Sequence, residues 1–185
     1  MTSSADKGRL LTTLARGAIA RAFGQGVQRP ALPEWLFQKG ATFVTLTQGG
    51  ELRGCIGSLE AHRPLVEDLE HNARAAAFDD PRFPALSEAE LPRTRVEVSI
   101  LSKPEPLRFK DEADALAQLR PGVDGVILET GWHRATFLPQ VWEQLPDPAE
   151  FMAHLKHKAG LALDYWSDDV RLSRYTVEKY KEETP

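Results

Sequence analysis

Apolar residues recur at two different periods along the chain. Four segments carry them at helical spacing and are predicted to be helices: residues 7–23, 64–78, 111–119 and 148–159. Residues 95–101 alternate strictly, with Val96, Val98 and Ile100 on one face, as expected of a half-buried strand. Helices and strands mixed in this way predict an α+β fold.

The segment from Phe43 to Ile56 predicts a β-hairpin, because two extended runs flank the turn signal Gln48-Gly49-Gly50. A three-residue loop pairs Leu46 with Leu52 and keeps the aliphatic residues on one face of the hairpin. A two-residue loop would set Leu46 opposite Arg53 and mix the two faces. We therefore predict the three-residue loop.

A second hairpin is expected over residues 125–138, followed by Pro139 and a helix. The order of hairpin, proline and helix repeats that of residues 41–78, which suggests an internal duplication. Residues 170–175 are predicted to form a strand or an extended arm. The polar tail beyond Val177 is expected to be frayed.

The first hairpin carries the only cysteine of the chain. On the predicted register Arg53 and Cys55 project from the face opposite the aliphatic residues. A guanidinium near a thiol favours the thiolate, which is the nucleophilic and metal-binding form. Gly54 and Gly57 flank the cysteine without side chains, so a ligand or another backbone could come close there.

Other polar residues could complete such a site, and each also has a plain structural explanation. If the strand over 95–101 neighbours the hairpin, Glu97 shares the face of the cysteine and could act as an acid–base group or, more commonly, form an ion pair. Asp80 and Arg82 lie in a proline-rich loop, where they could pair with each other or line a pocket. A lone free cysteine is itself most often a small buried hydrophobe.

The six residues Leu52-Arg53-Gly54-Cys55-Ile56-Gly57 resemble the signature of the AMMECR-type domain family, whose bacterial members are called AmmeMemoRadiSam system protein A. Five further matching segments follow in the right order: Asp80–Pro84, Val98–Leu101, Gly122–Val126, Phe137–Val141 and Lys158–Leu161. The resemblance covers about residues 10–180. Ser99 and Gln140 lie within matching segments and join Gly54, Gly57, Asp80 and Arg82 as ligand-binding candidates.

The resemblance implies two β-α repeats that share one curved, barrel-like antiparallel sheet with flanking helices. We expect a single AMMECR-type domain over residues 1–185, with subdomains at about 40–100 and 101–165 and terminal segments packed on them. The name of the gene system implies two kinds of partner, a Memo-type protein and a radical S-adenosylmethionine protein.

Composition narrows the classes of function. The chain has 185 residues, 42% of them hydrophobic, which suffices for a sizeable core. A net charge of -4 without a basic block argues against nucleic-acid binding. No run approaches the ~18 apolar residues that would span a membrane. A single cysteine excludes an internal disulfide, and the N-terminal sequence does not resemble a secretory signal, so a cytoplasmic location is expected.

Metal and cofactor motifs are not found in the sequence. His154 and His157 lie three residues apart, but neither a Cys-x-x-Cys nor a His-Glu-x-x-His pattern accompanies them. We therefore expect no metal and no cofactor.

Three hypotheses for function follow. The first is an enzyme or accessory factor of a modification pathway that uses Cys55 as a nucleophile, with Arg53 as its activating neighbour and Glu97 as a candidate base. The second is a binding or adaptor module that recognises a protein or a small ligand without turnover. The third is a purely structural role for the cysteine motif. The first is our preferred hypothesis.

Overall fold

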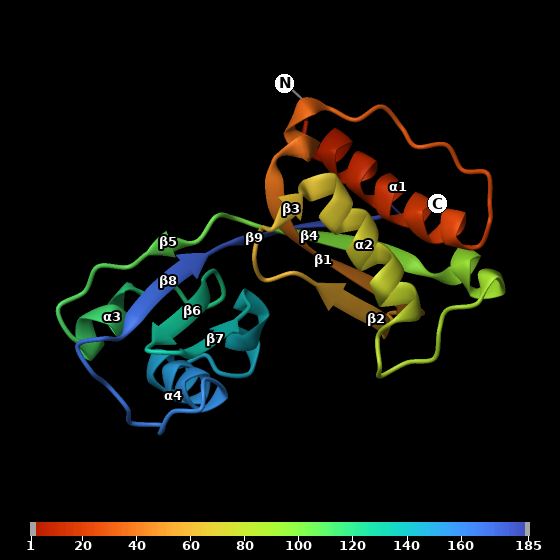
Figure 1. Ribbon diagram of the computed structural model, residues 1–185. Helices are drawn as coiled ribbons and strands as arrows, with labels where there is room; N and C mark the ends of the chain where they lie inside the picture. The colour runs from red at the N-terminus through yellow and green to blue at the C-terminus, as the bar shows by residue number, and fades with distance from the viewer. Residues whose placement is uncertain (1–2, 184–185) are drawn as a thin grey trace. The chain divides into compact units, whose positions relative to one another are not determined.

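Helices and two β-sheets make up the computed structural model, which describes residues 3–183 (Figure 1). The helices are α1 (Ser4–Ala22), η1 (Glu34–Phe37), α2 (Leu65–Phe78), η2 (Glu88–Arg93), α3 (Glu112–Gln118), η3 (Pro139–Glu143) and α4 (Pro148–Lys158). The strands are β1 (Lys39–Gln48), β2 (Glu51–Gly57), β3 (Arg63–Pro64), β4 (Arg95–Leu101), β5 (Glu105–Pro106), β6 (Gly125–Thr130), β7 (His133–Phe137), β8 (Arg171–Tyr175) and β9 (Val177–Lys181). The predicted α+β class with antiparallel pairing is confirmed.

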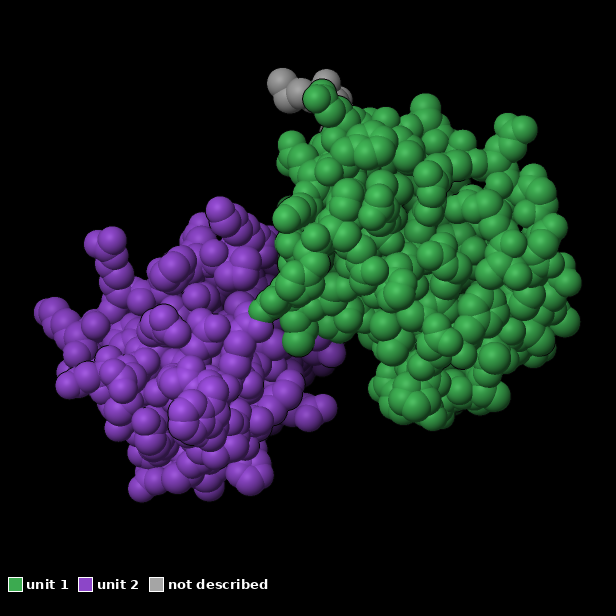
Figure 2. Space-filling model, in the orientation of Figure 1, with its two compact units in different colours: residues 1–101, 178–185 green, residues 102–177 purple. Residues whose placement is uncertain are grey.

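The chain divides into two compact units (Figure 2). Unit 1 comprises residues 1–101 and 178–185, and unit 2 comprises residues 102–177. Each unit has its own sheet: the strand order is β2-β1-β4-β9 with β3 beside β1 in the first, and β5-β8-β6-β7 in the second. The expectation of one shared, barrel-like sheet is therefore wrong, since the strands form two open sheets. The internal duplication stays a prediction.

In unit 1, α1 and α2 lie on the same face of the sheet (Figure 1). The sequence pattern explains this arrangement, because Leu11 and Leu14 of α1 and Leu69 of α2 meet Val44 and Val98 of the strands in one buried cluster. The side chains that alternate with these core residues along β1, β2 and β4 belong to the opposite face, which we call the helix-free face.

The first hairpin differs from its predicted register. Its loop has two residues, Gly49 and Gly50, with φ angles of +57° and +84° that favour glycine. Thr47 pairs with Leu52, and Leu46 then pairs with Gly54, so Arg53 is the extra residue of a β-bulge. The three-residue loop was wrong because the bulge, and not a longer loop, shifts the alternation that keeps the aliphatic residues together.

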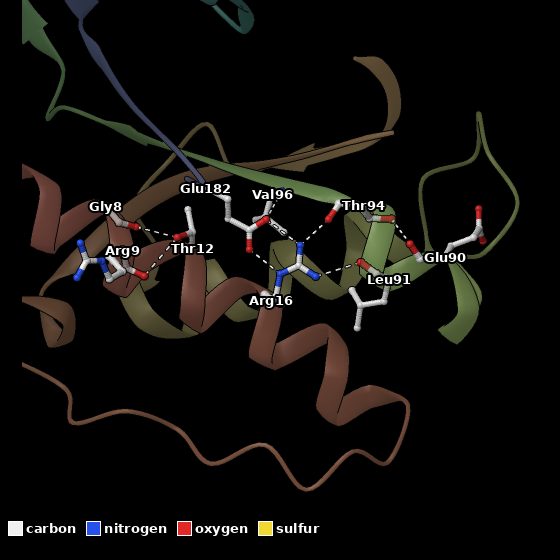
Figure 3. Close-up of polar contacts among 9 residues, drawn as sticks. All are labelled: Gly8, Arg9, Thr12, Arg16, Glu90, Leu91, Thr94, Val96 and Glu182. Atoms are coloured by element: carbon white, nitrogen blue, oxygen red, sulfur yellow. Dashed lines mark hydrogen bonds and ion pairs between the residues drawn. The ribbon is translucent and has the colours of Figure 1, made fainter. Parts of the chain in front are cut away.

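The C-terminal segment is an ordered part of unit 1. β9 lies beside β4, and Glu182 follows it directly. Arg16 of α1 donates to both oxygens of the Glu182 carboxylate, at 2.5 and 2.7 Å, and to the carbonyl groups of Leu91 and Thr94 (Figure 3). The prediction that the chain frays beyond Val177 is therefore wrong for β9, because these contacts hold the strand; residues 184–185 lie outside the described range.

Unit 2 has a separate core. Phe151 and Leu155 of α4 pack with Leu128 of β6, and the ring of Trp142 stacks on Phe151 at a centroid distance of 3.7 Å. Trp142 also donates its indole N–H to the carbonyl of Asp124 at 2.7 Å. The helix and hairpin predicted here are confirmed as α4 and β6–β7. No helix within residues 3–183 is both long and apolar enough to cross a membrane.

Candidate functional site

Cys55 lies in a row of three side chains on the helix-free face. Thr45 of β1 pairs with Cys55 of β2 on one side and with Glu97 of β4 on the other. The next row along the strands is Gly57, Phe43 and Ser99. The structure thus places Glu97 on the face of the cysteine, as expected if β4 neighbours the hairpin.

The thiol of Cys55 is half-buried and has a hydroxyl as its partner. The Sγ atom lies 3.3 Å from Oγ1 of Thr45, within hydrogen-bond distance. Thr45 is a neutral group that cannot serve as an acceptor for the thiol proton in the way that a histidine or carboxylate does. The hydrogen bond orients the thiol.

The backbone of Cys55 is held by the loop that follows α2. Because β2 is an edge strand, its outward amide groups need partners other than a strand. The buried carboxylate of Asp80 accepts the N–H of Cys55 at 2.9 Å, and Nη2 of Arg82 donates to the carbonyl of Cys55 at 3.4 Å. We call Asp80 and Arg82 together the Cys55 clamp.

The two members of the Cys55 clamp are also bound to each other. Asp80 accepts from the Nε and Nη2 atoms of Arg82, at 3.0 and 2.7 Å, and from its backbone N–H at 3.1 Å. The Arg82 guanidinium, followed by the backbone N–H groups, holds the pKa of the Asp80 carboxyl well below its usual range despite burial. Asp80 therefore stays ionised, and the clamp stays assembled, throughout the physiological pH range.

The guanidinium beside Cys55 is therefore that of Arg82 and not that of Arg53. Arg53 donates from Nε and Nη2 to the two carboxylate oxygens of Glu90, at 3.1 and 3.3 Å. The expected pairing of Arg53 with the thiol fails because the bulge at Arg53 breaks the alternation that would have placed both side chains together.

Glu90 connects the hairpin to η2. It accepts from Arg53, from Gln48 Nε2 at 3.3 Å, and from the backbone N–H of Ser87 at 2.8 Å, which completes a capping box. The hydrogen bonds from Arg53 first, and from Ser87 next, lower the pKa of Glu90 to about 2. The Ser-x-x-Glu spacing of residues 87–90 is visible in the sequence and could have identified Glu90 as a helix-capping residue, but it does not indicate the pairing with Arg53.

This lowered pKa predicts an acid-dependent loss of stability. A carboxylate whose pKa falls on folding stabilises the folded state above its unfolded pKa, and this contribution disappears as pH falls towards the folded pKa. We therefore expect Glu90→Gln to remove part of the decline in unfolding free energy between about pH 4.5 and 2. Urea unfolding across this range measures it, with Glu51→Gln at the exposed start of β2 as control. Identical pH profiles for the two variants would contradict the assignment.

The two glycines of the motif have packing roles. A Cβ atom on Gly54 would lie 2.1 Å from the carbonyl oxygen of Ala76, so the backbone of α2 occupies that space. A Cβ on Gly57 would lie 2.2 Å from the ring of Phe43, which covers it. The predicted close approach of another backbone is therefore confirmed at Gly54. Ligand binding at Gly54 and Gly57 stays a prediction, because protein atoms lie where a Cβ of either residue would be.

The remaining candidates lie away from the thiol. Glu97 is two strand spacings from Cys55, about 10 Å, and its carboxylate lies 3.4 Å from Nζ of Lys181. Ser99 is 6% exposed. Gln140 is an exposed residue of η3 and belongs to unit 2. Within residues 3–183, no group of three or more His, Cys, Asp or Glu side chains is placed to hold a metal ion.

The fold and this site define an α+β protein of two units with one free thiol on the helix-free face of its first sheet. The chain belongs to the AMMECR1 family, whose model matches residues 12–180. A protein of Methanothermobacter thermautotrophicus is 40% identical over 97% of this chain and 96% of its own length, and one of Methanocaldococcus jannaschii is 37% identical over 97% and 92%. The crystal structure of an uncharacterized protein from Pyrococcus horikoshii has a TM-score of 0.82 and 35% identity, covering 100% of this chain and 96% of that one. The predicted family membership is confirmed.

Proposed function

We propose that the chain is an accessory factor of a modification pathway that binds its ligand on the helix-free face around Cys55. The observation that carries the proposal is the half-buried thiol whose backbone N–H and C=O are both fixed by the Cys55 clamp. A group held in one position but still reachable is what a recognition site requires. The pathway itself is taken from the family resemblance. A cytoplasmic location, where a single thiol stays reduced, is part of the proposal.

The geometry favours binding over nucleophilic catalysis. A general base must lie within about 3 Å of the proton that it removes, directly or through one water. The thiol contacts Thr45, whereas Glu97 lies about 10 Å away across two strands. A cysteine-dependent enzyme is the second candidate, supported by the Arg82 guanidinium beside the residue that carries the thiol. A purely structural motif is the third, supported by the packing of Gly54 and Gly57.

The proposal predicts that Cys55 is modified in the folded chain. Since the thiol is half-buried, we expect iodoacetamide at neutral pH to alkylate it no more than about tenfold slower than in the denatured chain. Mass spectrometry gives an unambiguous readout because the chain has one cysteine. Labelling that occurs only in denaturant would favour the structural alternative. Turnover of a substrate that stops in Cys55→Ser would favour the enzyme.

We propose as partners the Memo-type and radical S-adenosylmethionine proteins that the name of the gene system implies. A partner that co-purifies with the intact chain and with Cys55→Ala, but not with Arg82→Ala, would support an adaptor that recognises its partner through the Cys55 clamp. Equal recovery of a partner with all three chains would place recognition on another surface.

A further inference from the structure

We propose that the Cys55 site takes a ligand that carries a carboxylate group, which docks on the outward end of Arg82. The inference deepens the proposed function and rests on it, because the ligand must reach the thiol. It concerns the chemistry of the ligand, which neither the fold nor the family establishes.

The Cys55 clamp is an ion pair with one end buried and one end exposed. The side chain of Asp80 is 2% exposed, whereas that of Arg82 is 56% exposed. Inside the protein, the carboxylate oxygens of Asp80 accept hydrogen bonds from the backbone N–H groups of Cys55 and Arg82 and from the Arg82 guanidinium. A ligand that approaches the clamp therefore meets its positive end.

Arg82 is held in place but still has hydrogen-bond donors to offer. Asp80 fixes the Nε and Nη2 atoms, Nη2 also donates to the carbonyl of Cys55, and the guanidinium lies 5.5 Å from the centre of the Phe83 ring. Nη1 makes no hydrogen bond to any residue in the part of the chain that the structure describes. A cation whose position is fixed before binding loses little side-chain freedom when a ligand binds.

A carboxylate suits this arrangement better than a phosphate does. Sites for phosphate dianions gather several cationic or backbone N–H donors around the anion. Here one guanidinium nitrogen is free, and Lys181 on the same sheet is engaged by Glu97. One accessible cation, bound to the backbone carbonyl of the residue that carries the thiol, can bind a single carboxylate while the rest of the ligand extends along the row of Thr45 and Glu97.

Two alkylating reagents of nearly the same shape test the inference. Iodoacetate and iodoacetamide both transfer a two-carbon group to sulfur: the S–C bond forms, the C–I bond breaks, iodide leaves and the thiol proton goes to solvent. Only iodoacetate carries a carboxylate. The measured quantity is the ratio of its rate to that of iodoacetamide, normalised to the same ratio for a free small thiol, so that intrinsic reactivity cancels.

We expect the normalised ratio to exceed one in the native chain and to fall about three- to tenfold in Arg82→Gln, the effect of one unit charge about 4 Å away that is screened as in bulk water. Arg82→Lys should keep most of the preference. Arg95→Gln is the matched control, because Arg95 is exposed on the same face but lies opposite Thr47, farther from Cys55. In the intact chain the ratio should also fall with rising ionic strength, which tests the inference even if the Arg82 variants do not fold.

The outcomes separate this inference from the function on which it rests. A native chain that neither reagent labels overturns the proposed function. A chain that both reagents label, with a ratio equal to that of the free thiol and unaffected by salt or Arg82→Gln, overturns only the carboxylate inference. Protection of Cys55 against iodoacetamide by acetate at fixed ionic strength supports the inference, and protection by inorganic phosphate alone contradicts it.

Discussion

Replacing Gly54 by alanine should destabilise the folded chain by at least about 2 kcal/mol, because the added methyl group has no space. Its Cβ would lie 2.1 Å from the carbonyl oxygen of Ala76, and this neighbour is backbone of α2 and not the flexible end of a side chain. Relief requires α2 to move away from β2, which opens the core cluster that both elements share. The melting temperature should fall by at least about 4 °C.

Chemical denaturation of purified variants measures this effect, and Gly26→Ala is the matched control. A Cβ on Gly26 meets no atom within 4 Å, and its φ angle lies outside the positive range that disfavours alanine. The control should change the unfolding free energy by less than about 1 kcal/mol in either direction. Equal stability of Gly54→Ala and Gly26→Ala would show that α2 does not pack on β2 as described.

Local periodicity predicted the elements of unit 1 well. The strand expected over residues 95–101 is β4, and the helix expected over 64–78 is α2, which begins one residue later because Pro64 stands at its N-cap. Both predictions rest on the spacing of the apolar residues that face a core, and this spacing can be read from neighbouring residues in the sequence. The polar tail has no such periodic signal. Its strand β9 is held by contacts with residues far away in the sequence, such as the ion pair between Arg16 and Glu182.

The candidate site was predicted only in part. The sequence identified Cys55, Asp80 and Arg82, but it could not show that the two loop residues hold the cysteine backbone, because that contact spans 25 residues and depends on where α2 ends. It assigned the neighbouring guanidinium to Arg53, since strict alternation cannot anticipate a bulge. The sequence shows glycine at positions 54 and 57. The reason for it, close packing within the protein, appears only in three dimensions.

The second large effect is expected at the opposite end of α2, in Asp68→Ala. Asp68 is 1% exposed, and its carboxylate accepts hydrogen bonds from the backbone N–H and hydroxyl of Thr42, at 2.8 and 2.7 Å, and from Ser58, Arg63 and Asn72. Alanine would leave buried donors on β1 without an acceptor. We expect a loss of at least about 3 kcal/mol in unfolding free energy.

Glu67→Ala provides the control, since this residue is exposed, carries the same charge and stands in the same helical turn. Its effect should stay within about 0.5 kcal/mol. Asp68→Asn should remain strongly destabilising, because an amide turns one acceptor into a donor that faces the existing donors. Asp68→Ala and Glu67→Ala variants of equal stability would contradict the buried network.

Asp68 and Gly54 hold the two ends of one helix against one sheet, so their effects should be coupled. The hydrogen bonds between Asp68 and Thr42 form when α2 lies close to the sheet. The same placement of α2 puts the carbonyl of Ala76 over Gly54. A helix displaced by Gly54→Ala has already weakened the Asp68 network, and the double variant should therefore lose less stability than the sum of the single losses. A double-mutant cycle by urea unfolding measures this difference, and strict additivity would mean that α2 relaxes independently at its two ends.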